Sequence, residues 1–264
     1  MAEFTVFYAW QSDTDETANR YLIRDAAKDA LTHLARDADL EDSPRLDSDT
    51  QQVAGTPELA ATIFGKIKKC GLFLCDLTYT SIATSSKDGS EQPCPNPNVL
   101  VEFGFALAHV GWDRIICVLN EAHGPAERMI FDIRHRRWPF TYVLPNKPDA
   151  SSRAAVRDVL AKNLEAGFRL AFQAEHESVL AIKARLDAAC MKLLYEHRGH
   201  EFFSYDPSQR LWAAVAMQST FSAISRLLDL GIIFAEFHTQ ADQHVAFSYK
   251  WTYIGRLLLK HLWG

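Results

Sequence analysis

The feature that most constrains the fold is a nearly continuous apolar run from Gly71 to Leu77. Such a run is typical of a strand covered on both faces of a sheet, because a strand with one wet face alternates apolar and polar residues. Thr5–Trp10 and Arg114–Leu119 repeat the pattern, and helical periodicity predicts helices over residues 17–36 and 98–109 between these runs. Strands that alternate with helices predict an α/β domain with a mostly parallel sheet.

Ligands of such sheets bind beyond the carboxyl ends of the strands. This rule predicts one crevice bordered by residues 8–13, 47–55 and 76–98 and by Asn120. Within the segment 76–98, residues 80–95 are rich in Ser, Thr, Lys, Asp, Gly, Gln and Pro, which favours a mobile loop.

The character of the chain changes after Pro148. We expect an α/β domain over residues 1–148, a helical connector over 149–200 with a break near Gln173, and a small α+β module over 201–264. In that module the pattern predicts a helix from Arg210 to Leu230, then a hairpin and a last helix capped by Thr252. This order resembles a winged helix.

The 264-residue chain is 48% hydrophobic and 23% charged, as in ordinary globular proteins, and its net charge is −5. No apolar run reaches the roughly 18 residues that a membrane-spanning helix needs. The five cysteines favour free thiols in a reducing compartment, and no Cys/His cluster has metal-ligand spacing. We therefore expect a cytoplasmic protein without a metal site or a membrane partner.

The strongest chemical signal is Glu102, which lies in the apolar segment Val99–Phe105. The preceding prolines, Pro95 and Pro97, predict that Asn98 caps this helix and that Glu102 lies one turn into it. A lone carboxylate in such a segment is costly to desolvate unless it faces a polar cleft. The alternative is that Glu102 caps a backbone amide or pairs with an arginine.

A second signal lies at the end of the first strand, where Tyr8 and Trp10 are followed by Gln11, Ser12 and Asp13. Aromatic rings followed by small polar groups suit a heteroaromatic ring joined to a sugar or phosphate. The alternative is that these are core aromatic residues followed by a helix cap.

Together these stretches resemble the bacterial TIR-like domains over residues 4–143. The matching segments are Phe7–Asp13, Asn19-Arg20, Leu46–Thr50, Gly55–Pro57 with Ile63, Cys75–Thr78, Asn96–Val99 with Glu102 and Gly104, and Phe131–Arg134 with Arg137. The resemblance implies a flavodoxin-like fold and cleavage of NAD, which is then a substrate and not a cofactor. It also implies a role as a toxic effector in anti-phage defence.

By this resemblance Glu102 is the catalytic glutamate. Many enzymatic members carry Trp four residues earlier, where this chain has Asn98, so Tyr8 or Trp10 would have to supply the stacking wall. We expect further sugar or water contacts from Ser12, Asp47, Asp76 and Asn98.

The spacing of Asn98, Glu102 and Gly104 is also similar to that in nucleoside deoxyribosyltransferases, whose glutamate is a nucleophile. A third alternative is a non-catalytic TIR domain that binds a nucleotide signal or scaffolds partners.

The resemblance further implies control by assembly into a homo-oligomer, through the segment Asp47–Pro57, with a partner defence protein or a signalling nucleotide as activator.

The C-terminal module has five basic and five acidic residues. The basic ones are Arg210, Arg226, Lys250, Arg256 and Lys260, and the acidic ones are Glu201, Asp206, Asp229, Glu236 and Asp242. With no basic excess, we expect protein contacts there and no DNA binding.

Overall fold

A computed structural model describes residues 4–36, 44–48, 59–135, 138–205, 214–239 and 245–264. Two compact units make up the chain, one spanning Glu3–Phe172 and the other containing Gln173–Gly264. The elements of the first unit are β1 (Thr5–Ala9), α1 (Arg20–Ala35), β2 (Arg45–Asp47), α2 (Leu59–Lys69), β3 (Leu72–Asp76), β4 (Tyr79–Thr84), β5 (Glu91–Pro95), α3 (Pro97–His109), η1 (Trp112–Arg114), β6 (Ile115–Asn120), η2 (Glu121–His123), η3 (Ala126–Arg128), α4 (Phe131–Arg134) and β7 (Phe140–Tyr142). Helix α5 (Ala150–Lys183) begins in the first unit and ends in the second, which also holds α6 (Ala188–His197), β8 (Phe202–Tyr205), α7 (Ala214–Asp229), β9 (Ile233–Thr239), β10 (Val245–Trp251) and α8 (Tyr253–Trp263).

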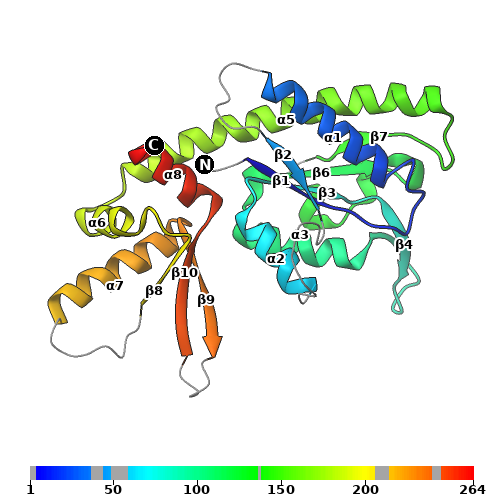
Figure 1. Cartoon of the computed structure of the whole chain (residues 1–264). Coiled ribbons are helices and arrows are strands. Elements are labelled where there is room, and N and C mark those ends of the chain that lie inside the picture. Colours follow the sequence, from blue (N-terminus) through cyan, green and yellow to red (C-terminus); the bar gives the residue numbers. More distant parts are fainter. Residues whose placement is uncertain (1–3, 37–43, 49–58, 136–137, 206–213, 240–244) are drawn as a thin grey trace. The chain divides into compact units, whose positions relative to one another are not determined.

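The first unit is built on a five-stranded sheet in the order β2-β1-β3-β6-β7, with every pair of neighbours parallel (Figure 1). This is the flavodoxin-like order, in which the direction of winding reverses between β1 and β3 and leaves a crevice there. All residues of β3 and β6 are buried. The α/β class and the two-sided burial of these strands are therefore confirmed.

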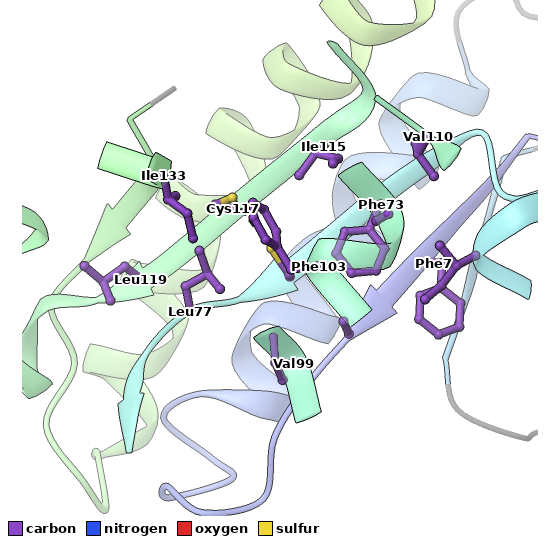
Figure 2. Packing of buried hydrophobic residues seen from close by; sticks show 14 of the residues in the cluster. Phe7, Phe73, Leu77, Val99, Phe103, Val110, Ile115, Cys117, Leu119 and Ile133 are labelled. Carbon is purple, nitrogen blue, oxygen red and sulfur yellow. Dashed lines mark hydrogen bonds between the residues drawn. The ribbon is translucent and has the colours of Figure 1, made fainter. Parts of the chain in front are cut away.

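Helices cover both faces of this sheet, α1 and α5 on one and α2 and α3 on the other (Figure 1). Beneath α2 and α3 lies a buried cluster that includes Phe7, Phe73, Phe103 and Ile115 (Figure 2). On the opposite face α5 lies close to β6 and β7 at Gly167, because a Cβ atom there would come within 2.8 Å of the Phe140 ring. Tight packing on both faces fixes the strand ends that border the crevice.

The second unit contains a three-stranded antiparallel sheet in the order β8-β10-β9. The hairpin of β9 and β10 follows α7, as the sequence pattern predicts, and the Thr252 hydroxyl accepts a hydrogen bond from the Gly255 amide at the start of α8. Gly255 is required there, since a Cβ atom would lie 2.1 Å from the Ile232 carbonyl oxygen. Of the helix expected over 210–230, the described part is Ala214–Asp229, and Arg210 lies outside the described residues.

The expectation of a loop over residues 80–95 is wrong, because β4 and β5 form an antiparallel hairpin there. Its turn is closed by the Ser85 amide, which donates to the Ser90 carbonyl at 2.8 Å, and by Gly89 at a φ of +71°. Most of β4 and much of β5 are exposed, so neither strand shows the apolar pattern of a buried strand. A two-stranded ribbon also tolerates Pro93, which a central strand would not.

The expectation of a helix break near Gln173 is also wrong. Helix α5 continues through that position to Lys183, and residues 168–178 contain neither Pro nor Gly to stop it. The interruption comes at Asp187, whose carboxylate accepts from the Cys190 amide at 2.8 Å and starts α6. The domain boundaries at residues 148 and 200 remain predictions, while the compact units divide between Phe172 and Gln173.

The residues that the structure describes contain neither a membrane-spanning helix nor a cluster of metal ligands. Among the helices in those ranges, none is both long and apolar enough to cross a membrane. Within the same ranges, no group of three or more His, Cys, Asp or Glu side chains is arranged to hold a metal ion.

Candidate functional site

The position of Glu102 is set by the start of α3. The Asn96 side chain caps this helix by accepting a hydrogen bond from the Asn98 amide at 2.8 Å, and Pro97 occupies the first helical position. The expected cap at Asn98 is therefore wrong by two residues, because Pro lacks an amide hydrogen and fits the first turn of a helix. The Asn96 amide nitrogen also donates to the Asp13 carboxylate at 2.6 Å, which ties α3 to the loop after β1.

Burial dominates the electrostatics of Glu102. It raises the pKa of this carboxyl from its usual 4.5 to about 7, and no other group contributes to the shift. Among the described residues, no side chain or backbone group makes a hydrogen bond or ion pair with the Glu102 carboxylate. The alternative in which Glu102 caps an amide or pairs with an arginine therefore finds no support there. An unpaired and partly desolvated carboxylate is a candidate for a functional group.

The Glu102 side chain borders a cleft of about 480 Å³ between the end of β1 and helices α2 and α3, which we call the Glu102 cleft. Its lining residues are Phe7, Tyr8, Ala9, Trp10, Gln11, Ser12, Ala60, Ile63, Phe64, Asn96, Asn98, Val101 and Glu102. Glu102 is the one charged side chain among these described residues. The cleft therefore combines apolar and aromatic walls with a few polar groups, as small-molecule sites do.

Four of the other expected site residues lie in this cleft, namely Tyr8, Trp10, Ser12 and Asn98. Tyr8 is only 2% exposed, and burial raises its pKa well above the usual value, so it is a neutral wall of the cleft. The Arg20 guanidinium lies 3.2 Å from the centre of the Trp10 ring. This cation–π contact covers one face of the indole and fixes its orientation.

Asp76 does not line the cleft. It is fully buried at the end of β3, where its carboxylate accepts hydrogen bonds from the Thr78 amide at 2.9 Å and from the Gln11 side chain at 3.4 Å. Burial raises the pKa of Asp76, although these hydrogen bonds oppose the shift. The physical role of Asp76 is thus to hold Gln11, which does line the cleft, and not to contact a ligand directly.

Asp47 is also absent from the Glu102 cleft. It ends the edge strand β2, and its carboxylate accepts a hydrogen bond from Lys66 of α2 at 2.8 Å. Asp47 lines a different cleft, which shares Tyr8 and Trp10 with the Glu102 cleft. Of the segment expected to control assembly, residues 49–57 lie outside the described residues.

Several residues of the Glu102 cleft were not expected from the sequence. Ile63 and Phe64 of α2 form an apolar wall, and the Phe64 ring stacks on Phe105 at a centroid distance of 4.4 Å. Val101 is 60% exposed at the cleft although it is aliphatic. The signal for this wall was present in α2, where Phe64 adjoins the periodic positions Ile63 and Ile67 and widens the apolar face.

No protein-family model matches this chain, and no curated protein matches it in a sequence search. The structural finding is accordingly a flavodoxin-like α/β unit that carries an apolar cleft with one unpaired carboxylate.

Proposed function

We propose that the protein is an NAD glycohydrolase of the TIR type and that Glu102 is its catalytic carboxylate. The observation that carries this proposal is the Glu102 side chain itself. It is the one charged group among the described lining residues of a largely apolar cleft, and no described protein group neutralises it. A cleft of this kind favours a ligand with an aromatic ring and a centre of positive charge.

The chemistry of NAD fits these features. Its nicotinamide ring is already cationic, so the bond from ribose C1′ to the ring nitrogen breaks with both electrons moving to the ring. Neutral nicotinamide leaves, and positive charge develops on the ribose. The ionised Glu102 carboxylate stabilises that charge while water attacks C1′. The products are nicotinamide, ADP-ribose and one proton, which passes to solvent.

The raised pKa of Glu102 suits this role. With a pKa of about 7, the carboxyl is close to half ionised at neutral pH in the free protein. A cationic nicotinamide ring in the cleft would lower this pKa, because an adjacent positive charge favours the ionised form. Substrate binding would therefore complete the ionisation that the chemical step requires. The burial that makes the carboxylate costly in the free protein strengthens its interaction with the substrate.

The resemblance to TIR-like domains supports two further parts of the proposal. The enzyme is a defence effector whose activity is restrained until the chain assembles, since unrestrained NAD cleavage would harm the host cell. A partner defence protein or a signalling nucleotide would supply the trigger. Low activity of the isolated chain at low concentration is then the expected result.

A nucleoside deoxyribosyltransferase is the second candidate, and the same unpaired carboxylate favours it. A free carboxylate at the ribosyl carbon can act as a nucleophile and form a covalent glycosyl intermediate. A binding domain without catalysis is the third candidate, because an apolar cleft with aromatic walls also suits a bound nucleotide.

One experiment separates the three candidates. The purified full chain is incubated either with NAD or with a deoxynucleoside and a second free base. Each reaction is run twice, once with dilute protein and once at high protein concentration with a crowding agent. Chromatography then identifies the products. Release of nicotinamide, greater in the concentrated sample, supports the proposal. Exchange of bases between deoxynucleosides would favour the transferase. Absence of both, with calorimetric binding of NAD, would favour a non-catalytic domain.

A further inference from the structure

A second cleft of about 290 Å³ adjoins the Glu102 cleft. Tyr8 and Trp10 line both clefts, so these two side chains at the end of β1 form a shared wall. The remaining lining residues of the second cleft come from α1 and from β2 with the residue after it. We call it the basic cleft because its lining includes Arg20, Arg24, Lys28 and Arg45. Because they share the Tyr8 and Trp10 side chains, the two clefts lie next to each other.

The lining of the basic cleft carries four cations, namely Arg20, Arg24 and Lys28 from α1 and Arg45 from β2. The three α1 residues are spaced by four positions, which places them on one face of the helix. Asp47 is the one carboxylate among these described lining residues. The charge of the basic cleft is thus opposite to that of the Glu102 cleft, which holds one carboxylate and, within its described lining, no cation.

The groups around the basic cleft do not cancel its net positive charge. Asp47 is paired with Lys66 at 2.8 Å, so the carboxylate in the cleft is already neutralised. The Lys28 side chain is exposed, and none of the described groups makes a hydrogen bond or ion pair with its ammonium. Lys28 can therefore bind an anion without breaking an existing ion pair.

The positive charges of Arg20 and Arg24 in α1 are partly compensated by carboxylates, and their guanidinium groups are held in place by these contacts. Arg20 pairs with Glu16 at 3.0 Å and lies over the Trp10 ring. Arg24 pairs with Asp25 at 2.7 Å, and Asp25 is shared with Arg153 at 2.8 Å. These contacts restrain the guanidinium groups, each of which has further N–H donors for a phosphate.

We propose that the basic cleft binds the phosphate groups of a nucleotide whose ribose occupies the Glu102 cleft. The placement of the ribose rests on the proposed function, whereas binding of phosphate by Lys28 and the arginines does not require catalysis. Guanidinium and ammonium groups around one cleft are the side chains that recognise phosphate oxygens. The substrate class is accordingly a phosphorylated ribosyl compound, and a free nucleoside would lack half of its contacts.

Charge reversal at Lys28 tests this inference. The Lys28→Glu variant is compared with Arg36→Glu, which changes the net charge equally at an exposed cation after the end of the same helix. Eight residues of helix separate the two positions by about 12 Å, which exceeds the screening length of about 8 Å at physiological salt. Both changes are made in the Glu102→Gln background, so that no ligand is consumed.

The ligands are pyrophosphate, nicotinamide mononucleotide and nicotinamide riboside, titrated into ¹⁵N-labelled full chain and followed by NMR. We expect Lys28→Glu to weaken binding of pyrophosphate and of the mononucleotide by about tenfold, the effect of losing one charge-assisted contact. Binding of the riboside should be unchanged, and Arg36→Glu should behave as the parent. Equal pyrophosphate affinities in the two variants, or equal affinities of the parent for mononucleotide and riboside, would overturn the inference.

The outcomes also separate this inference from the proposed function. Selective loss of pyrophosphate binding in Lys28→Glu, in a protein that never releases nicotinamide from NAD, would support the basic cleft and contradict the glycohydrolase. Release of nicotinamide by the wild type, with equal pyrophosphate binding in both variants, would contradict the basic cleft alone.

Discussion

Replacement of Glu102 by Gln should stabilise the folded protein at alkaline pH. Burial raises the pKa of the Glu102 carboxyl to about 7, against 4.5 in an exposed chain. The folded state therefore keeps this proton over a pH range in which the unfolded state has lost it. By linkage, the contribution of Glu102 to the free energy of unfolding falls as pH rises from about 4.5 to about 7 and is then constant.

The size of the effect follows from the shift. A difference of about 2.5 pKa units corresponds to at most about 3.4 kcal/mol, and the residual exposure of the side chain reduces this to about 2 kcal/mol. Glutamine has the same size and no charge to desolvate. Relative to the wild type, Glu102→Gln should thus raise the free energy of unfolding by about 2 kcal/mol at pH 8 and by much less at pH 4.5.

Urea unfolding of the two proteins at pH 4.5, 6 and 8 measures this difference, and carbon NMR of the Glu102 carboxyl measures its pKa directly. Comparison at equal pH removes the contributions of other titrating groups, among them Asp76, whose pKa is also raised. A variant that is less stable than the wild type at pH 8, or a difference that does not change with pH, would refute the reasoning. Either result would mean that Glu102 has a partner that compensates its charge.

Three other predictions follow from local structure. Thr252→Ala removes the cap of α8, where the hydroxyl accepts from the Gly255 amide at 3.0 Å, and should cost about 1 kcal/mol by thermal unfolding, while Thr252→Ser should cost less; equal losses in both variants would contradict the capping role. Iodoacetamide should modify Cys94 first in the native protein, because the other four cysteines are buried. Intact-mass spectrometry measures the number of adducts over time, and a second adduct that forms as fast as the first would contradict this prediction. Residues 198–264, expressed alone and assayed by fluorescence anisotropy, should not bind duplex DNA, since residues 201–264 have no basic excess; micromolar, salt-sensitive binding would instead favour a DNA-binding winged helix.

The sequence was sufficient to predict the inner strands of the central sheet, β1, β3 and β6, because they are buried almost throughout. The edge strand β7 was not predicted, since it is short and only its last residue is buried. Leu72–Asp76 and Ile115–Asn120 are nearly uniform apolar runs, and the helices between strands show clear periodicity. Glu102 could be singled out for the same reason, since a carboxylate in an apolar helix is conspicuous. Edge features were missed, because the exposed β4–β5 hairpin has the composition of a loop.

The remainder of the site depends on contacts between residues far apart in the chain. Asp76 and Gln11 are 65 positions apart, and their hydrogen bond links a fully buried carboxylate to a residue that lines the cleft. Similarly, the ion pair of Asp47 with Lys66 spans 19 positions. Composition and periodicity report local structure and burial, and they do not report which partner a buried polar group finds. Residue type therefore identified groups near the cleft without separating those that line it from those that support it.

The most direct test of the central claim is nicotinamide release from NAD by the full chain under the assembled conditions that give activity. Glu102→Gln is compared with Glu91→Gln, which makes the same change at an exposed glutamate on β5. Folding of each variant is verified by circular dichroism. The account predicts that Glu102→Gln lowers the rate by about 100-fold or more and that Glu91→Gln leaves it unchanged. Turnover at the wild-type rate by folded Glu102→Gln protein would contradict the assignment of Glu102 as the catalytic carboxylate.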